Sequence, residues 1–465
     1  MPRILIVGGG YAGFYTARRL EKWLRRGEAE VTVVDPLPYL TYQPFLPEVA
    51  AGSIEPRHAL VSLRRHLRST RVITARVTGI DHARRVATLT PEVGEPWEFE
   101  YDELVVTAGA ITRTFPIPGL ADSAIGMKNI EEAVAVRDRV IAGFDRAQNL
   151  PAGPQRQRLL TFVVVGGGFA GVETFGELLS LASSLVRRYP GIEFEELQFH
   201  LVEAMGRVMP EVSAKTAEWV VRDLRNRGGQ VHLDTQLSSV VDGHVELSTG
   251  QRFEAGTVVW TAGVAASPML RSTDLPLDER GRLRVGADLR VIDDTGVVEN
   301  AWGAGDAAAV PDLSGGGVGG YCVPNAQHAL RQGKRLARNL VSSLRGEQLV
   351  DYRHDNLGAV AGTGLGHGVF QSGGLAIKGL VAWAMHRGYH GLAIPTWERK
   401  LRVFGNWALS LVQRRDVISL EAVLTPREAF AGTAVRPKPA EVPDAAAAPA
   451  KKTAAKRTTA AAATK

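Results

Sequence analysis

Two stretches of the chain share one order of hydrophobic and polar positions. In each, a continuous apolar run leads into a cluster of glycines and then into a helical pattern, first over Arg3 to Leu20 and again over Leu159 to Leu179. A continuous apolar run of this length is typical of a strand that is buried on both faces. The pattern therefore predicts a strand, turn and helix that occur twice, as an internal repeat on the scale of a domain.

Further strand-like runs follow each of these units. Together with the helical patterns between them, they predict an α/β protein with two Rossmann-like, three-layer nucleotide-binding domains. The expected strands are Val31 to Asp35 and Leu104 to Gly109 in the first half, and Gln198 to Glu203, Val231 to Leu233 and Thr257 to Gly263 in the second.

The pattern changes after Leu289. A strand-like run from Val297 precedes a glycine-rich loop, Ser314 to Gly320, and a helix that starts near Asn325. This part has no glycine fingerprint of its own, and we expect it to return to the first domain. Two amphipathic helices are expected further on, Ile377 to Leu392 and Trp397 to Val412, with Leu401, Phe404, Ala408 and Leu411 along one face of the second.

Composition narrows the class of protein. The chain has 465 residues, 45% of them hydrophobic and 22% charged, which is typical of a soluble globular protein with two or three domains. Its only cysteine, Cys322, excludes a disulfide framework, a thiolate zinc site, an iron–sulfur cluster and a redox CxxC pair within the chain. We expect Cys322 to be a packing residue.

The ends of the chain differ in character. The N-terminus runs straight into a strand pattern without a signal peptide, so we expect a protein that is not exported. The net charge is +6, and the segment from Arg436 to Lys465 holds seven Lys and Arg against two acids. Its Ala, Lys, Pro and Thr residues cannot bury enough apolar area to fold, which predicts a disordered tail.

The first glycine cluster fits a dinucleotide-binding fingerprint. Gly8 permits the tight turn, Gly10 lets the backbone approach a pyrophosphate, and Gly13 lets the helix pack on the strand. The helix N-terminus offers N–H groups to the phosphates. Asp35 ends the next strand, where a carboxylate meets the ribose hydroxyls.

The second cluster repeats this arrangement with Gly166, Gly168 and Gly171, and Glu203 ends the following strand. A carboxylate there accepts hydrogen bonds from a free 2′-hydroxyl and repels a 2′-phosphate, which favours NADH over NADPH. Arg207 lies nearby in the sequence and argues the other way.

Two fingerprints need two nucleotides. Asp306 follows a strand after the second domain, where its carboxylate fits the ribityl chain of a flavin held by the first domain. The Thr-Ala-Gly sequences that end at Gly109 and Gly263 close one strand in each half. They are either small-residue sites that let a crossing loop approach the nucleotide or ordinary tight turns.

These motifs resemble those of type II NADH dehydrogenases, the single-subunit, non-proton-pumping NADH:quinone oxidoreductases of the pyridine nucleotide-disulfide reductase superfamily. The resemblance covers roughly residues 1 to 425 and is carried by GGGFAGVETFGEL, PNAQHALRQGKRLARNL and the aromatic and basic C-terminal region. It implies that FAD contacts Gly8, Gly10, Gly13, Asp35, Gly109 and Asp306, and that NADH contacts Gly166, Gly168, Gly171 and Glu203.

The resemblance also implies residues for quinone reduction. Glu173 would relay protons near flavin and quinone, and Gln327 and Gln332 would lie near the isoalloxazine ring and the quinone entrance. Reducing a quinone consumes two protons and a hydride brings only one, so a titratable group is needed. Alternatively, Glu173 is a helix-start acid and the glutamines are helix surface. His328 and Arg331 are expected only to solvate the helix.

Quinones dissolve in lipid, so the C-terminal region is expected to contact a membrane. The sequence contains no run of 18 or more apolar residues, so no membrane-spanning helix is expected. The two amphipathic helices instead combine apolar faces with basic residues, as interfacial helices do. The basic residues are Lys378, Arg387, Arg399, Lys400, Arg402, Arg414 and Arg415, against Glu398 alone. Interfacial anchors would be Trp383, Trp397 and Trp407. The alternative is a core or homodimer interface.

The sequence thus predicts an FAD-dependent NADH:quinone oxidoreductase of the respiratory chain, peripheral to the cytoplasmic face of the cell membrane. It would reduce menaquinone or ubiquinone and bind no specific nucleic acid or metal. The rivals are a soluble NADH-dependent reductase of a ferredoxin or rubredoxin, and a protein that senses flavin and NADH. We expect residues 1–120 and 291–373 to form the FAD-binding domain and residues 121–290 to form the NADH-binding domain. Residues 374–430 would be the membrane-associating region, and residues 431–465 the disordered tail.

Overall fold

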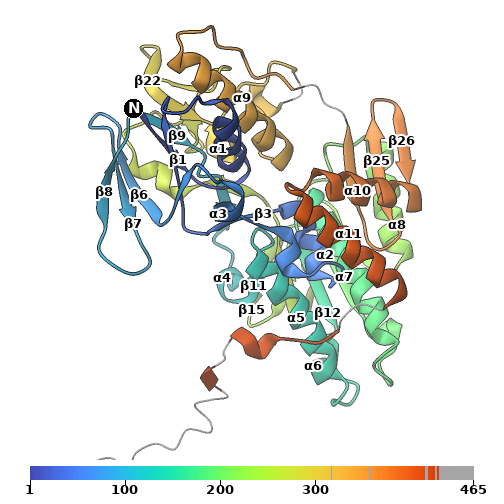
Figure 1. Ribbon diagram of the computed structural model, residues 1–465. Coiled ribbons are helices and arrows are strands. Elements are labelled where there is room, and N and C mark those ends of the chain that lie inside the picture. Colours follow the sequence, from blue (N-terminus) through green and yellow to red (C-terminus); the bar gives the residue numbers. More distant parts are fainter. Residues whose placement is uncertain (316, 355–357, 414–416, 425–426, 429–465) are drawn as a thin grey trace, which may run out of the picture. The chain divides into compact units, whose positions relative to one another are not determined.

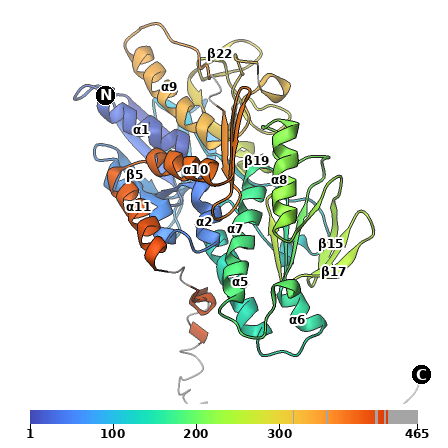
Figure 2. The ribbon, with the colours of Figure 1, turned by 90° about the vertical axis from the view of Figure 1, so that its right-hand side faces the viewer.

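The computed structural model describes residues 1–315, 317–354, 358–413, 417–424 and 427–428. Met1–Glu421 form one compact unit, and the remaining unit is Ala422–Lys465. The expected tail, residues 431–465, lies outside the described residues. Every element discussed below belongs to the first unit (Figures 1 and 2).

The first fingerprint strand, β1 (Arg3–Val7), lies inside a six-stranded sheet. It pairs in parallel with β2 (Glu30–Asp35) on one side and with β9 (Glu103–Val106) on the other. β9 pairs in parallel with β22 (Val297–Gly303), so the chain returns to the first sheet after leaving the second. The sheet order is β21-β22-β9-β1-β2-β5, with β21 (Arg290–Ile292) and β5 (Arg71–Thr74) at the edges.

The second fingerprint strand, β12 (Thr161–Val165), lies at the centre of a five-stranded sheet whose strands are all parallel. Every residue of β12 is buried, in accord with its continuous apolar sequence. The sheet order is β11-β18-β12-β13-β14, with β11 at Ala124–Ile125, β18 at Thr257–Trp260, β13 at Gln198–Val202 and β14 at Gly229–His232.

Helices follow both fingerprint strands. α1 (Tyr11–Trp23) packs against α9 (Ala326–Leu344), and the two lie together beside the first sheet (Figure 1). α7 (Phe169–Val186) contacts β12 and β13 of the second sheet, and α8 (Ala214–Asn226) contacts β14. α5 (Ile130–Ala147) begins at Asn129 with a capping box and packs against β18. The expected doubly wound α/β fold is confirmed.

Each half also carries a small antiparallel sheet before its last strand. β6 (Arg76–Asp81), β7 (Val86–Thr90) and β8 (Trp97–Glu100) precede β9 in the first half. β15 (Leu237–Val241), β16 (His244–Leu247) and β17 (Arg252–Glu254) precede β18 in the second. The repeat seen in the glycine clusters therefore extends from the glycine turn to the strand after this small sheet in each half.

The C-terminal region forms a three-stranded sheet and two helices. The antiparallel strands are β24 (Ala359–Gly362), β25 (Gly368–Ser372) and β26 (Leu375–Lys378). Helix α10 (Leu380–Ala393) packs on β24 and β25, and α11 (Trp397–Val412) follows. Ile377, expected to start the first amphipathic helix, belongs to β26. This sheet crosses the expected segment boundary between residues 373 and 374.

The remaining elements are short. They are β3 (Tyr39–Thr41), α2 (Leu46–Ala50), β4 (Leu60–Ser62), α3 (Leu63–His66), β10 (Ala110–Thr112), α4 (Leu120–Ser123), α6 (Pro154–Leu159), β19 (Val264–Ala266), β20 (Leu283–Arg284) and β23 (Ala308–Ala309).

Candidate functional site

The first glycine turn is too tight for any other residue at two of its positions. Gly8 has φ +98°, and a Cβ there would lie 2.4 Å from the carbonyl oxygen of Thr107. A Cβ on Gly13 would lie 1.8 Å from the carbonyl oxygen of Gly8. At Gly10, by contrast, a Cβ would have no protein atom within 4 Å. This open backbone at the start of α1 leaves room for a phosphate group.

Asp35 lies beside this turn. Its carboxylate accepts hydrogen bonds from the N–H of Gly9 at 2.7 Å and from that of Leu37 at 2.7 Å. Burial raises the pKa of Asp35, although both backbone donors oppose the change. The acid thus lies at the end of β2 next to the glycine turn, which is the place expected for it.

The second turn repeats this geometry. Gly166 has φ +109°, and a Cβ there would lie 2.7 Å from the Thr261 hydroxyl. A Cβ on Gly171 would lie 1.7 Å from the carbonyl oxygen of Gly166. Gly168 again has open space around a Cβ. Both halves therefore close the turn with the first and third glycines and leave the middle one exposed.

Glu203 takes the place of Asp35 in the second half. Its carboxylate accepts hydrogen bonds from the N–H groups of Gly167 and Met205. Arg207, which argued for a 2′-phosphate in the sequence, donates to the carbonyl oxygens of Pro210 and Val212 in its own loop. The arginine is therefore engaged with backbone rather than directed at the carboxylate.

The two Thr-Ala-Gly turns connect the halves. Gly109 has φ +67° and Gly263 has φ +100°. The strands that follow them, β10 and β19, pair with each other in antiparallel fashion. Each sequence is therefore a tight turn that leads into a strand of the β10–β19 pair, and a close approach of the nucleotide to these turns stays a prediction.

Asp306 follows β22 and lines a small cavity together with His328, Gln332 and Cys322. Lys128, from the second half, lies with its Nζ 3.5 Å from Oδ2 of Asp306. No sequence signal pointed to Lys128, because it belongs to a loop and its partner is far along the chain.

The two glutamines have different surroundings. Gln332 is buried, and its side-chain oxygen accepts a hydrogen bond from the N–H of Gly305 at 2.7 Å. It therefore holds the turn that carries Asp306. Gln327 is half-buried in the first turn of α9. Among the described residues, no hydrogen bond joins either glutamine to Glu173.

Two further residues of this cavity, His328 and Cys322, are buried. His328, expected only to solvate the helix, is buried, and its Nδ1 lies 2.9 Å from the Tyr352 hydroxyl. That prediction was wrong, because the chain after α9 folds back over this face of the helix. Cys322 is buried, and burial raises the pKa of its thiol to about 11. An unreactive thiol agrees with the expected packing role.

Glu173 is buried in α7 and lies beyond the first helical turn, which contains no acid. Its Oε1 accepts a hydrogen bond from the N–H of Gly362 at 3.1 Å and lies 3.1 Å from Nε2 of His386. Both partners come from the C-terminal region. Because they are about 190 and 210 residues away in the sequence, pattern analysis could not identify them.

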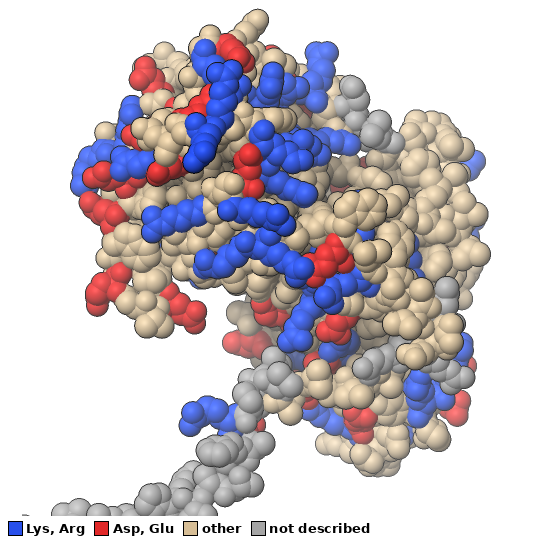
Figure 3. All heavy atoms as spheres, in the orientation of Figure 1, with Lys and Arg blue, Asp and Glu red and all other residues tan. Residues whose placement is uncertain are grey.

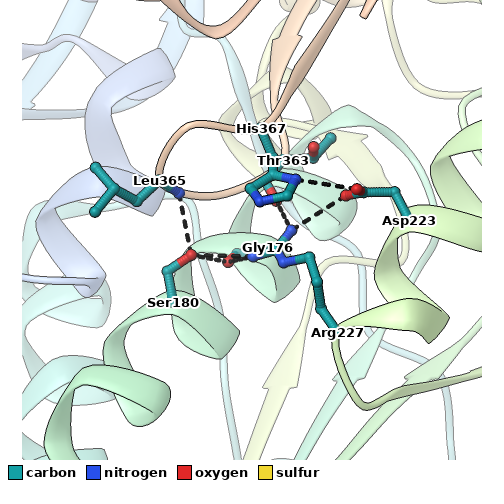
Figure 4. Close-up of polar contacts among 7 residues, drawn as sticks. All are labelled: Gly176, Ser180, Asp223, Arg227, Thr363, Leu365 and His367. Carbon is teal, nitrogen blue, oxygen red and sulfur yellow. Dashed lines mark hydrogen bonds and ion pairs between the residues drawn. The ribbon is translucent and has the colours of Figure 1, made fainter. Parts of the chain in front are cut away.

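A polar cluster fastens the C-terminal sheet next to Glu173 (Figure 4). Arg227 of α8 donates to the carbonyl oxygens of Thr363 and Gly176 and to the Ser180 hydroxyl. His367 lies with its Nδ1 3.0 Å from Asp223, which also pairs with Arg227. The cluster thus holds the β24–β25 turn against α7 and α8, and this turn follows directly on Gly362.

Helices α10 and α11 are amphipathic, but not all expected residues face outward. Trp397 is 76% exposed, whereas Trp407 is only 7% exposed and donates its indole N–H to Glu48 at 3.0 Å. Arg387, expected at the lipid surface, is buried and pairs with Glu48 at 2.8 Å. Trp407 and Arg387 therefore dock the helices on α2, which corrects both expectations.

The outward faces of these helices are apolar. Over this part of the molecule, Figure 3 shows a largely uncharged surface with Lys and Arg gathered beside it. The exposed apolar side chains of the two helices are Leu380, Val381, Tyr389, Leu392, Trp397, Leu401, Phe404, Leu409 and Val412. The side chain of Leu411, the last residue of the expected apolar face, lies outside the described residues.

One described helix, α7, is long and apolar enough to cross a membrane by length and composition alone. However, 67% of it is buried inside the protein, as in the core helix of an ordinary domain.

Known proteins are similar to this chain in sequence and in fold. The family model described as pyridine nucleotide-disulphide oxidoreductase matches residues 2–333. A probable NADH dehydrogenase of Dictyostelium discoideum is 27% identical over 426 residues, with 90% of this chain and 91% of that protein covered. A type II NADH:quinone oxidoreductase of Mycobacterium tuberculosis is 27% identical over 446 residues, with 93% and 92% covered.

Among solved structures, NDH2 from Plasmodium falciparum in complex with NADH matches with a TM-score of 0.81. The match covers 90% of this chain and 99% of that chain at 18% identity. At this level of identity the match concerns the fold, which is shared over almost the whole length.

Proposed function

The chain belongs to the pyridine nucleotide-disulphide oxidoreductase family, and from this premise we propose that it is a type II NADH:quinone oxidoreductase. It would pass electrons from NADH to FAD and then to a quinone. The two glycine turns, one in each half, supply the two nucleotide sites that such a reaction requires.

The first half fits FAD. Gly8 and Gly13 close the turn, Gly10 leaves space for the pyrophosphate, and Asp35 lies where the ribose hydroxyls would be. Asp306 would hold the ribityl chain, with Gln332 supporting its turn. The flavin, when bound, supplies the redox chemistry by accepting a hydride and releasing two electrons. The protein orients the two substrates around it.

The second half fits NADH in the same way. Gly166, Gly168 and Gly171 would take the pyrophosphate, and the Glu203 carboxylate would accept the ribose hydroxyls. Because Arg207 is held by backbone carbonyls, it offers little support to a 2′-phosphate. NADH is therefore the expected donor rather than NADPH.

The electrons would leave by a different route from that of the disulfide reductases. The sequence contains one cysteine, Cys322, so no dithiol pair within the chain can accept electrons. The Cys322 thiol is buried, and its pKa is raised to about 11. A quinone is the acceptor in the name of the Mycobacterium tuberculosis relative, and Glu173 is the buried acid that would supply its second proton.

The C-terminal helices would bring the enzyme to the lipid that dissolves the quinone. Their outward faces carry exposed apolar side chains, among them Trp397 at 76% and Val412 at 88% exposure. The neighbouring Lys400 and Arg402 would attract anionic headgroups. We place the enzyme at the cytoplasmic face of the cell membrane, as a peripheral protein.

The observation that carries this proposal is the position of Glu173, buried beneath helices whose outer face is apolar. The test is the absorbance of the purified full-length protein. We expect the purified protein to contain bound flavin. NADH should bleach the flavin absorbance, and a short-chain quinone analogue should restore it within one turnover. Flavin that is reoxidised by a ferredoxin but not by the quinone would contradict the proposal.

Membrane binding is tested separately, by sedimentation with anionic and neutral vesicles. Leu401→Asp should weaken sedimentation without changing flavin reduction by NADH, because the Leu401 side chain is 70% exposed. If Leu401→Asp instead turns a dimer into a monomer while vesicle binding is unchanged, the apolar face is a homodimer interface.

A further inference from the structure

Helix α10 has an unusual inner face. Its outer side chains, such as Leu380 and Leu392, are apolar and exposed, whereas His386 and Arg387 are buried against the protein. Burying charged groups in this way is costly unless they are paired. Each of the two has an acidic partner on a different helix, so α10 docks through two ion pairs.

These two pairs differ in one chemical respect. Arg387 pairs with Glu48 at 2.8 Å, and a guanidinium keeps its proton at any physiological pH. His386 lies with Nε2 3.1 Å from Oε1 of Glu173, and an imidazole gains or loses its proton near neutral pH. Only the second pair can exchange a proton during catalysis.

The surroundings keep that proton on His386. Burial alone lowers the pKa of His386, but the hydrogen bond and charge of Glu173, with further help from Glu48 and Glu177, outweigh it and raise the pKa above the usual value. The charged group on its other side, Arg387, is held by Glu48. The neighbouring acids therefore favour the protonated form of His386.

The next residues along α10 cannot take this role. His390 lies against His386 with ring centroids 4.6 Å apart, and burial followed by the charge of His386 holds its pKa well below the usual value. Its Nδ1 lies 3.0 Å from the Tyr42 hydroxyl, and burial raises the pKa of Tyr42 well above the usual value. His390 and Tyr42 thus form a neutral pair, and the mobile proton belongs to His386.

We propose that His386 stores the second proton of quinone reduction and delivers it through Glu173. This inference rests on the proposed function. Conversion of a quinone to a quinol takes up two electrons and two protons, and NADH supplies both electrons and one proton as hydride. The pair loses one proton to the quinone and regains it from water. His386 acts through Glu173 and is therefore a positioning residue.

A purely structural role would not require a histidine here. Buried ion pairs stabilise proteins weakly, and well-packed apolar residues often serve as well. The Arg387–Glu48 pair, with the indole N–H of Trp407 on the same carboxylate, already docks α10 and α11 on α2. The Gly362 N–H, placed by the Arg227 cluster, fixes the Glu173 carboxylate from the other side.

The experiment measures the two half-reactions of the full-length protein separately, by stopped flow. His386→Gln keeps a hydrogen-bonding side chain but removes the proton store. Flavin reduction by NADH should be unchanged, and flavin reoxidation by a short-chain quinone should slow by about 10²-fold. In the wild type, reoxidation should slow as pH rises through the raised pKa of His386, and the variant should lack this pH dependence.

The matched control is His200→Gln. His200 is also a buried histidine, but it contacts His232 and Gln198 on the second sheet, and burial lowers its pKa to about 4. It should leave both half-reactions and their pH dependence unchanged. His386→Lys, which keeps a cation beside Glu173, should restore folding if His386→Gln loses flavin.

The outcomes separate this inference from the proposed function. If no quinone reoxidises the reduced flavin of the wild-type protein, the proposed function is contradicted. If quinone reoxidises the wild-type flavin at a rate that does not change with pH, only the role of His386 is contradicted. This outcome does not depend on whether the variants fold. Equal slowing of both half-reactions in His386→Gln would likewise show that the histidine is structural.

Discussion

The two fingerprint helices, α1 and α7, start from the same geometry and end with different roles. Counted from the glycine turn, Tyr15 in α1 occupies the position that Glu173 occupies in α7, and Arg18 occupies that of Gly176. Both helices begin with a glycine whose Cβ would lie less than 2 Å from the carbonyl oxygen of the turn. The turn is therefore a common constraint, and the difference lies one turn further along each helix.

The C-terminal region meets both helices at these equivalent positions, but in different ways. On α7 it comes into direct contact, because the Gly362 N–H reaches Glu173 and a Cβ on Gly176 would lie 2.1 Å from the Thr363 carbonyl oxygen. On α1, Tyr15 and Arg18 line a cavity with residues 393–397 and Lys400. The two glycine turns are thus alike, whereas the surroundings of the equivalent helix positions differ because the C-terminal region contacts α7 directly.

The largest effect is expected where the two turns are alike. Gly13→Ala and Gly171→Ala each force a Cβ to within 2 Å of a backbone oxygen, at 1.8 Å and 1.7 Å. Neither backbone can yield without moving a strand, so each variant should lose several kcal/mol of stability, on the order of 3 or more. Gly13→Ala should lose flavin, measured by absorbance, and Gly171→Ala should lose flavin reduction by NADH.

Gly10→Ala and Gly168→Ala are the matched controls, because their Cβ atoms enter open space. These variants should fold with nearly wild-type melting temperatures and bind their nucleotides more weakly. A Gly10→Ala variant that melts as early as Gly13→Ala would show that the turn is not constrained in the way described.

The second-largest effect is expected at the helix position where the two halves differ, Glu173 in α7 and Tyr15 in α1. Glu173→Gln keeps the hydrogen bond from Gly362 but removes the titratable group, so flavin reoxidation by quinone should slow by about 10²-fold while flavin reduction by NADH is unchanged. Tyr15→Phe, at the equivalent position of α1, should change neither step by more than about 2-fold, since burial raises the pKa of Tyr15 and keeps it protonated. Stopped-flow absorbance measures both. Equal effects on the two steps would contradict a proton role for Glu173.

This difference between the halves also marks how far the sequence could predict the molecule. The glycine turns, Asp35, Glu203 and the return of the chain after residue 290 depend on local rules of backbone geometry, and the structure has them where the patterns predicted. The partners of Glu173 depend on tertiary packing. No local pattern brings His386 or Gly362 to it across about 200 residues.

The tryptophans of α11 show the same limit. Trp397 and Trp407 are both interfacial anchors by sequence pattern, yet one is 76% exposed and the other donates a buried hydrogen bond to Glu48. Both faces of α11 contain apolar residues, so periodicity alone could not show which face docks. The deciding interaction is the pairing of Trp407 and Arg387 with one carboxylate on α2.

A third prediction tests the close approach on α7. Gly176→Ala places a Cβ 2.1 Å from the Thr363 carbonyl oxygen, so the β24–β25 turn must move away. We expect a loss of about 1–3 kcal/mol in the free energy of unfolding, measured by chemical denaturation. Slower reoxidation by quinone should accompany it, since Gly362 moves with the turn. Unchanged stability would mean that the C-terminal sheet adapts without cost.

A smaller effect is expected at the ribose carboxylates. Glu203→Ala removes the acceptor at the second turn and should raise the KM for NADH about 10-fold while reducing the preference over NADPH. Its backbone partner, the Gly167 N–H, remains free to bind water. Asp35→Ala should instead weaken flavin retention and leave that preference unchanged. If Glu203→Ala keeps the wild-type preference, Glu203 does not contact the ribose.

The smallest effect is expected at Arg18 of α1, where a cavity separates the helix from the C-terminal region. Arg18 lines the cavity with Lys400 and has no ion-pair partner in the part of the chain that the structure describes. Arg18→Ala loses at most its cation–π contact with Phe14, at 5.9 Å from the ring centroid, which corresponds to about 0.5 kcal/mol. Chemical denaturation should therefore give a nearly wild-type free energy of unfolding, in contrast to Gly176→Ala. A loss equal to that of Gly176→Ala would mean that the C-terminal region holds both fingerprint helices equally, and the distinction between the two halves would rest on Glu173 alone.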